Sequence, residues 1–278
     1  MDRKKRMCID RAVRALVQLF FFIMFPGLFQ AAFSGVKYVA MQMSGSRRIE
    51  MVPFIVCLII LSGFTIAAGR FFCGFVCAFG SFGDAVYGIS QYIQKKLKKK
   101  LPCIPDGFVV YLQKLKYIIL ALIIVLCFAG SYSVFASNSP WIVFSKLRAL
   151  ELHTGFPLAG IIVFILVIAG MCVTERFFCQ FLCPMGALFA LLPVIKWQYP
   201  HKRKDKCLEG CSLCARNCPV CIEPGSKERN GECIKCGKCV SGCPVMGMYI
   251  PGNMGIYNNI AVFIEAAALF VLVYIFYA

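Results

Sequence analysis

Nine of the chain's eighteen cysteines lie in the 37 residues from Cys207 to Cys243. The second half of this stretch runs from Cys233 to Pro244 with the spacing C-x2-C-x2-C-x3-C-P. Thiolates at this spacing hold iron–sulfur clusters. Three reach three irons from a tight loop, and the fourth precedes a proline, which cannot continue a helix. The first half, up to Pro219, repeats the pattern with one extra residue in its first gap. The stretch therefore predicts iron–sulfur chemistry.

The two halves together resemble a two-cluster bacterial ferredoxin. This resemblance implies crossed ligation, in which the fourth cysteine of each half binds the other cluster. One [4Fe–4S] cluster would be held by Cys207, Cys211, Cys214 and Cys243. The other would be held by Cys233, Cys236, Cys239 and Cys218. Cys221 is left over and could replace Cys207, whose spacing is the unusual one. Zinc knuckles and a disulfide framework are the alternatives, although zinc sites usually pair C-x2-C units across a longer spacer.

A second set of cysteines lies in an internal repeat. The motif R-F-F-C-x3-C begins at Arg70 and again at Arg176, and it supplies Cys73, Cys77, Cys179 and Cys183. We expect these four thiols to face each other near the inner leaflet. They could hold a third iron–sulfur cluster, act as a redox-active dithiol or disulfide set, or pack as small apolar residues. The two arginines could offset the negative charge of thiolate-bound iron or extend to the lipid headgroups.

The elements that must position these cysteines are strongly apolar. Of the 278 residues 60% are hydrophobic, and the mean hydropathy is +0.75, which a soluble domain would not carry. Segments long and apolar enough to span a membrane are residues 15–33, 52–69, 117–136, 156–173 and 259–278. Pro26 and Gly27 should kink the first of them. The apolar stretches after the two motifs, residues 81–93 and 187–195, are too short to span and should re-enter or lie on the inner surface.

The distribution of basic residues predicts the orientation. Counted on alternate sides of these five segments, 25 lysines and arginines fall on one side and five on the other. The positive-inside rule then puts the N-terminus and the cysteine stretch in the cytoplasm and the C-terminus outside. The net charge of +17 is thereby explained without a nucleic-acid partner. Thiols that bind clusters also need a reducing compartment. No secretory signal peptide with a small-residue cleavage site is evident.

The predicted fold is an α-helical integral membrane protein with about five transmembrane helices in a parallel internal repeat. A small cytoplasmic two-cluster ferredoxin domain of the α+β type is inserted before the last helix. The predicted domains are two membrane halves, residues 1–95 and 96–196, the ferredoxin domain, residues 197–252, and a C-terminal transmembrane helix, residues 253–278.

Several further residues carry expectations of their own. Glu265 lies inside the last predicted span, where a carboxyl could move protons or make a helix–helix hydrogen bond. The basic run at residues 95–100 could anchor the chain to anionic lipid or dock an acidic redox partner. His153 and His201 are the only histidines, and neither lies on a predicted span, so no b-type haem is expected. Residues 131–155 should include a short outer helix. A packing role is expected of the remaining cysteines, Cys8, Cys57, Cys103, Cys127 and Cys172.

The repeated motif, the spans and the ferredoxin stretch together resemble the NapH/NosR-type membrane polyferredoxins. That family has a proline after both short motifs, whereas here Pro184 follows Cys183 but Ala78 follows Cys77. The resemblance implies an electron-transfer subunit of a membrane oxidoreductase complex. Its donor would be a cytoplasmic ferredoxin, another cytoplasmic carrier or the quinone pool. Its partner at the outer face would be a flavin- or haem-bearing subunit.

Two other functions fit parts of the same pattern. A copper-reducing assembly factor shares the architecture, and its soft copper ligands would be Met41, Met43 and Met51. A redox sensor is the other alternative, although the sequence has no evident output domain.

Overall fold

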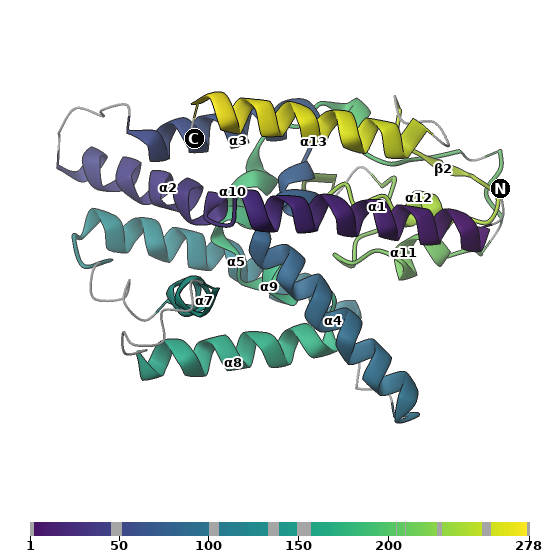
Figure 1. Cartoon of the computed structure of the whole chain (residues 1–278), viewed down its shortest axis with the longest axis horizontal. Helices are drawn as coiled ribbons and strands as arrows, with labels where there is room; N and C mark the ends of the chain where they lie inside the picture. Colours follow the sequence, from purple (N-terminus) through teal and green to yellow (C-terminus); the bar gives the residue numbers. More distant parts are fainter. Residues whose placement is uncertain are drawn as a thin grey trace. The chain divides into compact units, whose positions relative to one another are not determined.

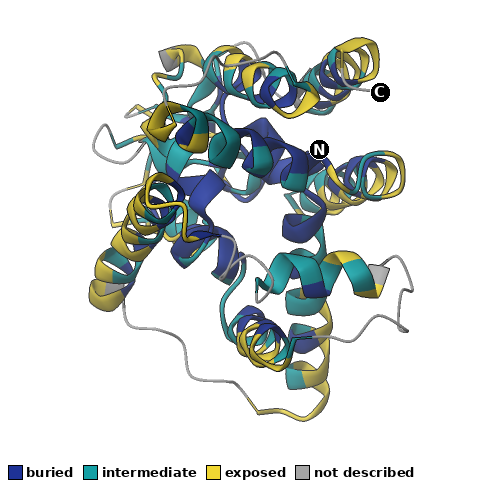
Figure 2. Ribbon diagram, turned by 90° about the vertical axis from the view of Figure 1, so that its left-hand side faces the viewer, coloured by how far each residue is buried: buried dark blue, intermediate teal, exposed yellow. Residues whose placement is uncertain are grey.

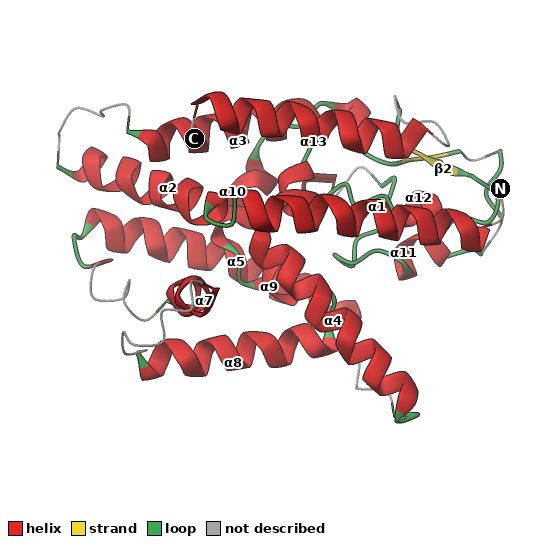
Figure 3. Ribbon diagram, in the orientation of Figure 1, coloured by secondary structure: helices red, strands yellow, loops and turns green. Residues whose placement is uncertain are grey.

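The structure is a computed structural model that describes residues 3–45, 52–99, 106–132, 139–148, 157–203, 205–208, 210–226, 230–251 and 257–276. Most of these residues are helical, and the strands that they include form one two-stranded sheet (Figure 1 and Figure 3). The mostly helical character expected from the sequence is therefore confirmed.

The chain divides into two compact units, each built from several separate segments. The first unit comprises Met1–Pro26, Ile59–Ser81 and Gly186–Ala278, and the second comprises Gly27–Leu58 and Phe82–Met185. The first unit contains Cys73 and Cys77 together with the whole ferredoxin stretch, and the second contains Cys179 and Cys183. The domain boundaries given above stay a prediction.

In the first unit, the N-terminal helix connects the last helix with the ferredoxin stretch. Helix α1 (Arg3–Met24) runs beside α13 (Tyr257–Phe276), and the rings of Phe20 and Phe270 lie 5.4 Å apart (Figure 1). Helix α1 also packs on the π-helical turn η1 (Phe72–Val76) and on α12 (Lys238–Ser241) of the ferredoxin stretch. The first C-x3-C motif and the ferredoxin stretch thus share one supporting helix.

The ferredoxin stretch is closed by a short sheet. Strand β1 (His201–Lys202) pairs antiparallel with β2 (Met248–Tyr249), so the residues just before the first cysteine and just after the last are held together. Between the strands lie α11 (Leu213–Arg216), η3 (Asn230–Glu232) and α12, and η2 (Lys196–Gln198) precedes them. This small α+β arrangement brings the two halves of the ferredoxin stretch together.

In the second unit, helix α2 (Leu28–Ser44) packs on α5 (Asp106–Phe128), and α8 (Leu158–Val173) packs on α7 (Pro140–Arg148) and α9 (Phe177–Phe181). An aromatic core joins these helices, because the Trp141 ring contacts the rings of Phe29, Phe33 and Phe178. The short helix expected within residues 131–155 is present as α7. Its tryptophan packs inside the unit.

Two described helices are long and apolar enough to cross a membrane, over Gly107–Phe128 and Asn259–Phe276. A third is added if α1 and α2, which a short break separates, are taken as one bent span. The chain leaves the helix at Pro26 and Gly27, so the predicted break is confirmed. Helices α3 (Pro53–Ala68) and α8 are apolar but have 16 residues each. Large apolar residues are exposed on these helices, as contact with lipid requires. Exposed residues are yellow in Figure 2.

Helix α5 begins well before the span predicted at residues 117–136. The helix starts at Asp106 and includes two lysines that lower the local hydropathy. The span predicted from hydropathy therefore begins too late. Lys116 is buried, and the Lys114 ammonium lies over the Tyr111 ring. The apolar stretches after the two motifs are the helices α4 (Ala78–Lys96) and α10 (Pro184–Leu191). Part of the basic run forms the exposed last turn of α4.

Candidate iron–sulfur sites

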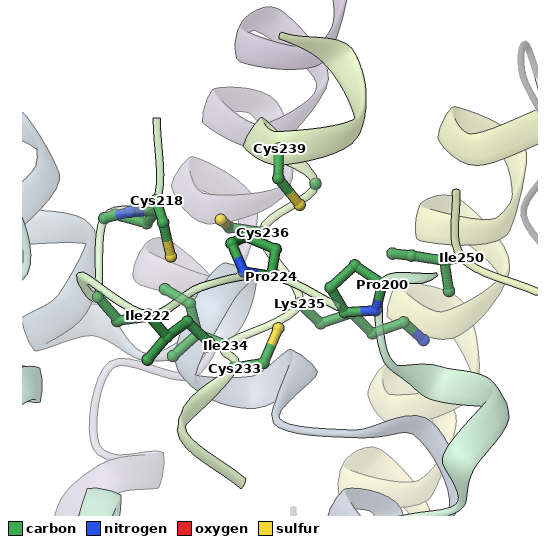
Figure 4. A pocket seen from close by; sticks show the side chains of 13 residues that line it. Pro200, Cys218, Ile222, Pro224, Cys233, Ile234, Lys235, Cys236, Cys239 and Ile250 are labelled. Carbon is green, nitrogen blue, oxygen red and sulfur yellow. The ribbon is translucent and has the colours of Figure 1, made fainter. Parts of the chain in front are cut away.

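Four cysteines of the ferredoxin stretch line one cavity, which we call the second site. They are Cys218, Cys233, Cys236 and Cys239, and their sulfurs point into a space of about 350 Å³, counted to its open mouth (Figure 4). These are the four that crossed ligation groups together. The other lining side chains are mainly prolines and aliphatic residues, so four thiols meet in an apolar pocket. Lys235 and Gly237 adopt positive φ angles of 53° and 73°, which produce the tight turns between the cysteines.

The remaining four ferredoxin cysteines line another cavity, which we call the first site. Cys207, Cys211, Cys214 and Cys243 line this cavity, which has about 330 Å³ of space when its open mouth is included. Cys221 is exposed and does not line this cavity, so the structure brings Cys207, with its unusual spacing, to the other three. The backbone N–H of Gly247 donates a hydrogen bond to Cys243 Sγ over 3.3 Å. Hydrogen bonds to ligand sulfurs are one means by which proteins set cluster potentials.

Each of the two cavities offers four thiols, the ligand set of a [4Fe–4S] cluster. Within the residues that the structure describes, no three cysteine, histidine, aspartate or glutamate side chains converge on a point that could hold one metal ion. In a cubane each thiolate binds its own iron, so the four sulfurs surround a volume instead of meeting at a point. Both cavities have this form.

Burial favours the protonated form of three thiols of the second site, Cys218, Cys233 and Cys239. Burial raises the pKa of Cys218 to about 12 and that of Cys233 to about 11, and it also raises the pKa of Cys239. Arg70 and Lys235 partly oppose the shift at Cys233, because their positive charges favour its thiolate. Metal ligands must be deprotonated, so filling this site releases protons.

Arg70 and Arg176, which start the two repeat motifs, are both buried and both face carboxylates. Arg70 Nη1 donates to the carbonyl oxygen of Gly231 over 3.0 Å and lies 3.3 Å from Glu232 Oε2. Arg176 donates two hydrogen bonds to the Asp84 carboxylate, from Nε to Oδ1 over 2.7 Å and from Nη2 to Oδ2 over 2.6 Å. Each guanidinium is about 2% exposed, so extension of these side chains to the headgroups is not what the structure shows. Arg70 instead ties the first motif to the loop that carries the second site.

Glu265, singled out in the last predicted span, forms an ion pair with a lysine of the ferredoxin stretch. Lys235 Nζ lies 2.5 Å from Glu265 Oε1 and also donates to the carbonyl oxygen of Ala68 and to the side chain of Gln198. Burial lowers the pKa of Lys235, and the Glu265 carboxylate opposes this shift. The sequence pointed to Glu265 but gave no sign of its partner, because a lysine between two cluster cysteines has the appearance of an exposed loop residue.

We expect Lys235→Met to destabilise the protein by about 3–5 kcal/mol, because it leaves a buried carboxylate without its partner. The double variant Lys235→Met/Glu265→Leu should recover most of this loss, since an apolar pair can replace a buried ion pair. The thermal midpoint of the purified protein in detergent measures both effects. A double variant as unstable as the single one would show that the ion pair is not the cause.

The two C-x3-C motifs share one backbone hydrogen bond, although the first lies on a π-helical turn and the second on a short α-helix. The N–H of Cys77 donates to the carbonyl oxygen of Phe72, and the N–H of Cys183 to that of Phe178, each over five residues and 2.9 Å. All four cysteines of the motifs are buried.

The residue after each motif has the same structural role. Ala78 and Pro184 are the first residues of α4 and α10. Proline is well tolerated at the first position of a helix but is not required there. Alanine after the first motif is therefore compatible with the same chain path.

The other residues named from the sequence are placed as follows. Met41 and Met43 are exposed on α2, while Met51, Cys103 and His153 lie outside the described residues. Cys57 and Cys127 are buried, as a packing role requires, and Cys172 is half-buried. Cys8 is exposed, so the expected packing role is wrong for it, because it lies on the part of α1 before the predicted span.

Comparison with known proteins finds a similarity in the segments of the repeat. The model of a 4Fe-4S binding domain family matches residues 51–101 and 156–198, the two segments that contain the R-F-F-C-x3-C motifs. An uncharacterized protein of Methanocaldococcus jannaschii is 28% identical over 234 residues, which are 83% of this chain and 79% of that protein. No solved structure matches the chain significantly.

Several other relatives have descriptive names, and two of them illustrate the similarity. The ferredoxin-type protein NapH of Escherichia coli is 24% identical over 189 residues, 65% of this chain and 61% of that protein. The regulatory protein NosR of Pseudomonas aeruginosa is 28% identical over 190 residues, 66% of this chain and 25% of that protein. The cysteine-lined cavities and the apolar helices of this chain fit its similarity to these relatives. The resemblance predicted from the sequence is confirmed: the chain is similar to membrane ferredoxin-type electron transport proteins such as NapH and NosR, and two of its segments match a 4Fe-4S binding domain family.

Proposed function

We propose that the chain is the membrane electron-transfer subunit of an oxidoreductase complex. It relays electrons between a cytoplasmic or quinone-pool donor and a partner at the outer face. The observation that carries this proposal is the pair of cavities in the ferredoxin stretch, each lined by four cysteines drawn from both halves of the motif. Each [4Fe–4S] cluster bound there would accept and release one electron at a time.

The ligands that we propose follow the two cavities. Cys207, Cys211, Cys214 and Cys243 bind one cluster at the first site, and Cys218, Cys233, Cys236 and Cys239 bind the other at the second site. The four repeat cysteines Cys73, Cys77, Cys179 and Cys183 bind a third cluster, two from each motif. Support for the third comes from the 4Fe-4S family match, which covers the segments of the repeat.

The membrane arrangement that we propose has five spans in a parallel repeat, in the cytoplasmic membrane. The N-terminus and ferredoxin stretch lie in the cytoplasm and the C-terminus outside, as the distribution of basic residues indicates. The bilayer core is about 30 Å thick, and the predicted outer loops, residues 34–51 and 137–155, contain no cysteine. A flavin- or haem-bearing subunit at the outer face would complete the electron path.

Reporter fusions test this orientation. A reporter that is active only outside the cytoplasm should be active when fused after Ala278 and inactive when fused near Lys227. A reporter that requires the cytoplasm should give the reverse pattern. Exchanged activities would overturn the five-span arrangement but would leave the cysteine sites untouched.

Low-temperature EPR of the anaerobically purified protein tests the function itself. Reduction with dithionite should produce the signals of reduced [4Fe–4S] clusters at low potential, and an added one-electron acceptor should remove them reversibly. A chain that gains no signal on reduction, although folded and complete, is not an electron carrier of this kind.

A further inference from the structure

Three contacts join the loop of the second site to the first repeat motif and the last helix. The loop, residues 231–237, includes two of the four cysteines of that site, and all partners lie in the same unit. Arg70 binds the carbonyl oxygen of Gly231 at its start. Lys235 in its middle binds Ala68 and Glu265. The third contact, at Gly74, is between backbones.

Gly74 is the place where the two segments touch directly. A Cβ atom at this position would overlap the carbonyl oxygen of Ile234, which lies between the two cysteines of the loop. Gln18 Nε2 on α1 donates a hydrogen bond to the carbonyl oxygen of Gly74 over 3.2 Å. This hydrogen bond and the adjacent α1 restrict movement of the first motif away from Ile234. The second motif has Gln180 at the matching position, and its amide donates to the carbonyl oxygen of Glu175. The first motif thus has a glycine where the ferredoxin loop approaches.

Aromatic rings line the same junction. Phe71 and Phe75 stack with their ring centroids 4.6 Å apart. Together with Cys236 and Glu265 they line a small cavity beside the second site. Phe71 and Phe75 lie on either side of Cys73 in the sequence, so packed atoms connect the second site to the first C-x3-C motif.

The first site differs in its surroundings. Its loop includes Leu208, which is 57% exposed, whereas Ile234 and Lys235 in the loop of the second site are buried. Lys202 and Lys206 beside it are also exposed. This loop is therefore open to a soluble redox partner, in contrast to the loop of the second site.

We propose that the two ferredoxin sites have different partners, and that the loop of the second site is the junction through which electrons pass between the ferredoxin stretch and the membrane segment. Gly74 is the positioning residue of this junction, since it permits the backbone contact with Ile234. The first site faces the soluble carrier. The proposal rests on the proposed function, because it requires that both sites hold clusters.

The test compares two acceptors that reach the protein from different sides. The purified protein in lipid nanodiscs is reduced with dithionite, the excess is removed, and re-oxidation is followed by freeze-quench EPR. Hexaammineruthenium(III) accepts one electron from the aqueous side. A ferrocenium salt with a long alkyl chain accepts one electron from within the bilayer and becomes ferrocene.

Gly74→Ala should slow re-oxidation by the lipid-soluble ferrocenium several-fold, because the added Cβ pushes the loop of the second site away from the first motif and lengthens the electron path. Gly74→Gln, which copies the second motif, should slow it further. Re-oxidation by hexaammineruthenium(III) and the midpoint potentials should stay unchanged. Gly63→Ala is the matched control, because a Cβ at position 63 meets nothing within 4 Å.

Hydrogen exchange adds a measurement that does not depend on electron transfer. In Gly74→Ala the amides of residues 231–237 should exchange faster than in Gly63→Ala, while those around Cys207–Cys214 should not change. Equal ferrocenium rates in the two variants, with full iron content in both, would overturn the proposal. Absence of clusters from the unaltered protein would instead overturn the proposed function. If Gly74→Gln loses its clusters, the ferrocenium re-oxidation rate of Gly74→Ala alone decides whether the proposal holds.

Discussion

Replacing Cys236 by serine should remove about a third to a half of the iron, depending on whether the chain binds three clusters or two. The low-potential EPR signal of the second site should disappear with it. Cys236 is one of the four cysteines whose sulfurs point into that cavity (Figure 4). A hydroxyl is a far weaker ligand for iron of a cluster than a thiolate, and the apolar wall offers no substitute.

Cys221→Ser is the matched control for this variant. Cys221 lies in the same stretch but is exposed and lines neither ferredoxin cavity. Its replacement should leave iron and EPR signals as they are. Iron loss in Cys221→Ser comparable to that in Cys236→Ser would show that Cys221 is a ligand after all. Unchanged iron in Cys236→Ser would show that the second site holds no cluster.

Replacing Cys183 by alanine should abolish electron transfer across native membrane vesicles and remove about a third of the iron, because one of three clusters loses a ligand. The EPR signals of the two ferredoxin sites should remain, since their eight cysteines are intact. Cys77→Ala should behave in the same way if each motif supplies two ligands.

Cys172→Ala controls for a general effect of losing a cysteine from the second unit. Cys172 belongs to α8, is half-buried and fits no ligand spacing, so its replacement should preserve electron transfer. A Cys183→Ala variant with full iron and full electron transfer would reduce the repeat cysteines to a packing role. Loss of transfer without loss of iron would point to thiol redox chemistry at the repeat.

The two cavities are lined by the two groups of cysteines that the ferredoxin resemblance implies, while their role as cluster ligands stays a prediction. The extra residue after Cys207 left two readings open, and only the structure brings Cys207 to the first site while leaving Cys221 outside. The helix break at Pro26 and Gly27 was likewise predictable, since both residues act on their own backbone. Local constraints of this kind transfer directly from sequence to structure.

Contacts between distant segments could not be predicted. Lys235 and Glu265 are 30 residues apart, and Arg70 and Glu232 are 162 apart. Nothing in either local sequence marks these partners. The start of α5 was also missed, because Lys114 and Lys116 lower the hydropathy of a segment that is nevertheless helical. The difference between Gly74 and Gln180 was visible in the repeat, but its meaning depends on the approach of Ile234.

The central claim, that this chain carries iron–sulfur clusters for electron transfer, is tested most directly by iron and acid-labile sulfide per chain after anaerobic purification. We predict about twelve irons and as many sulfides if the repeat holds a cluster, and about eight of each from the ferredoxin sites alone. Iron that follows the ligand variants in steps of about four would establish the separate sites. A chain that holds zinc in place of iron, or iron without sulfide, would contradict the account.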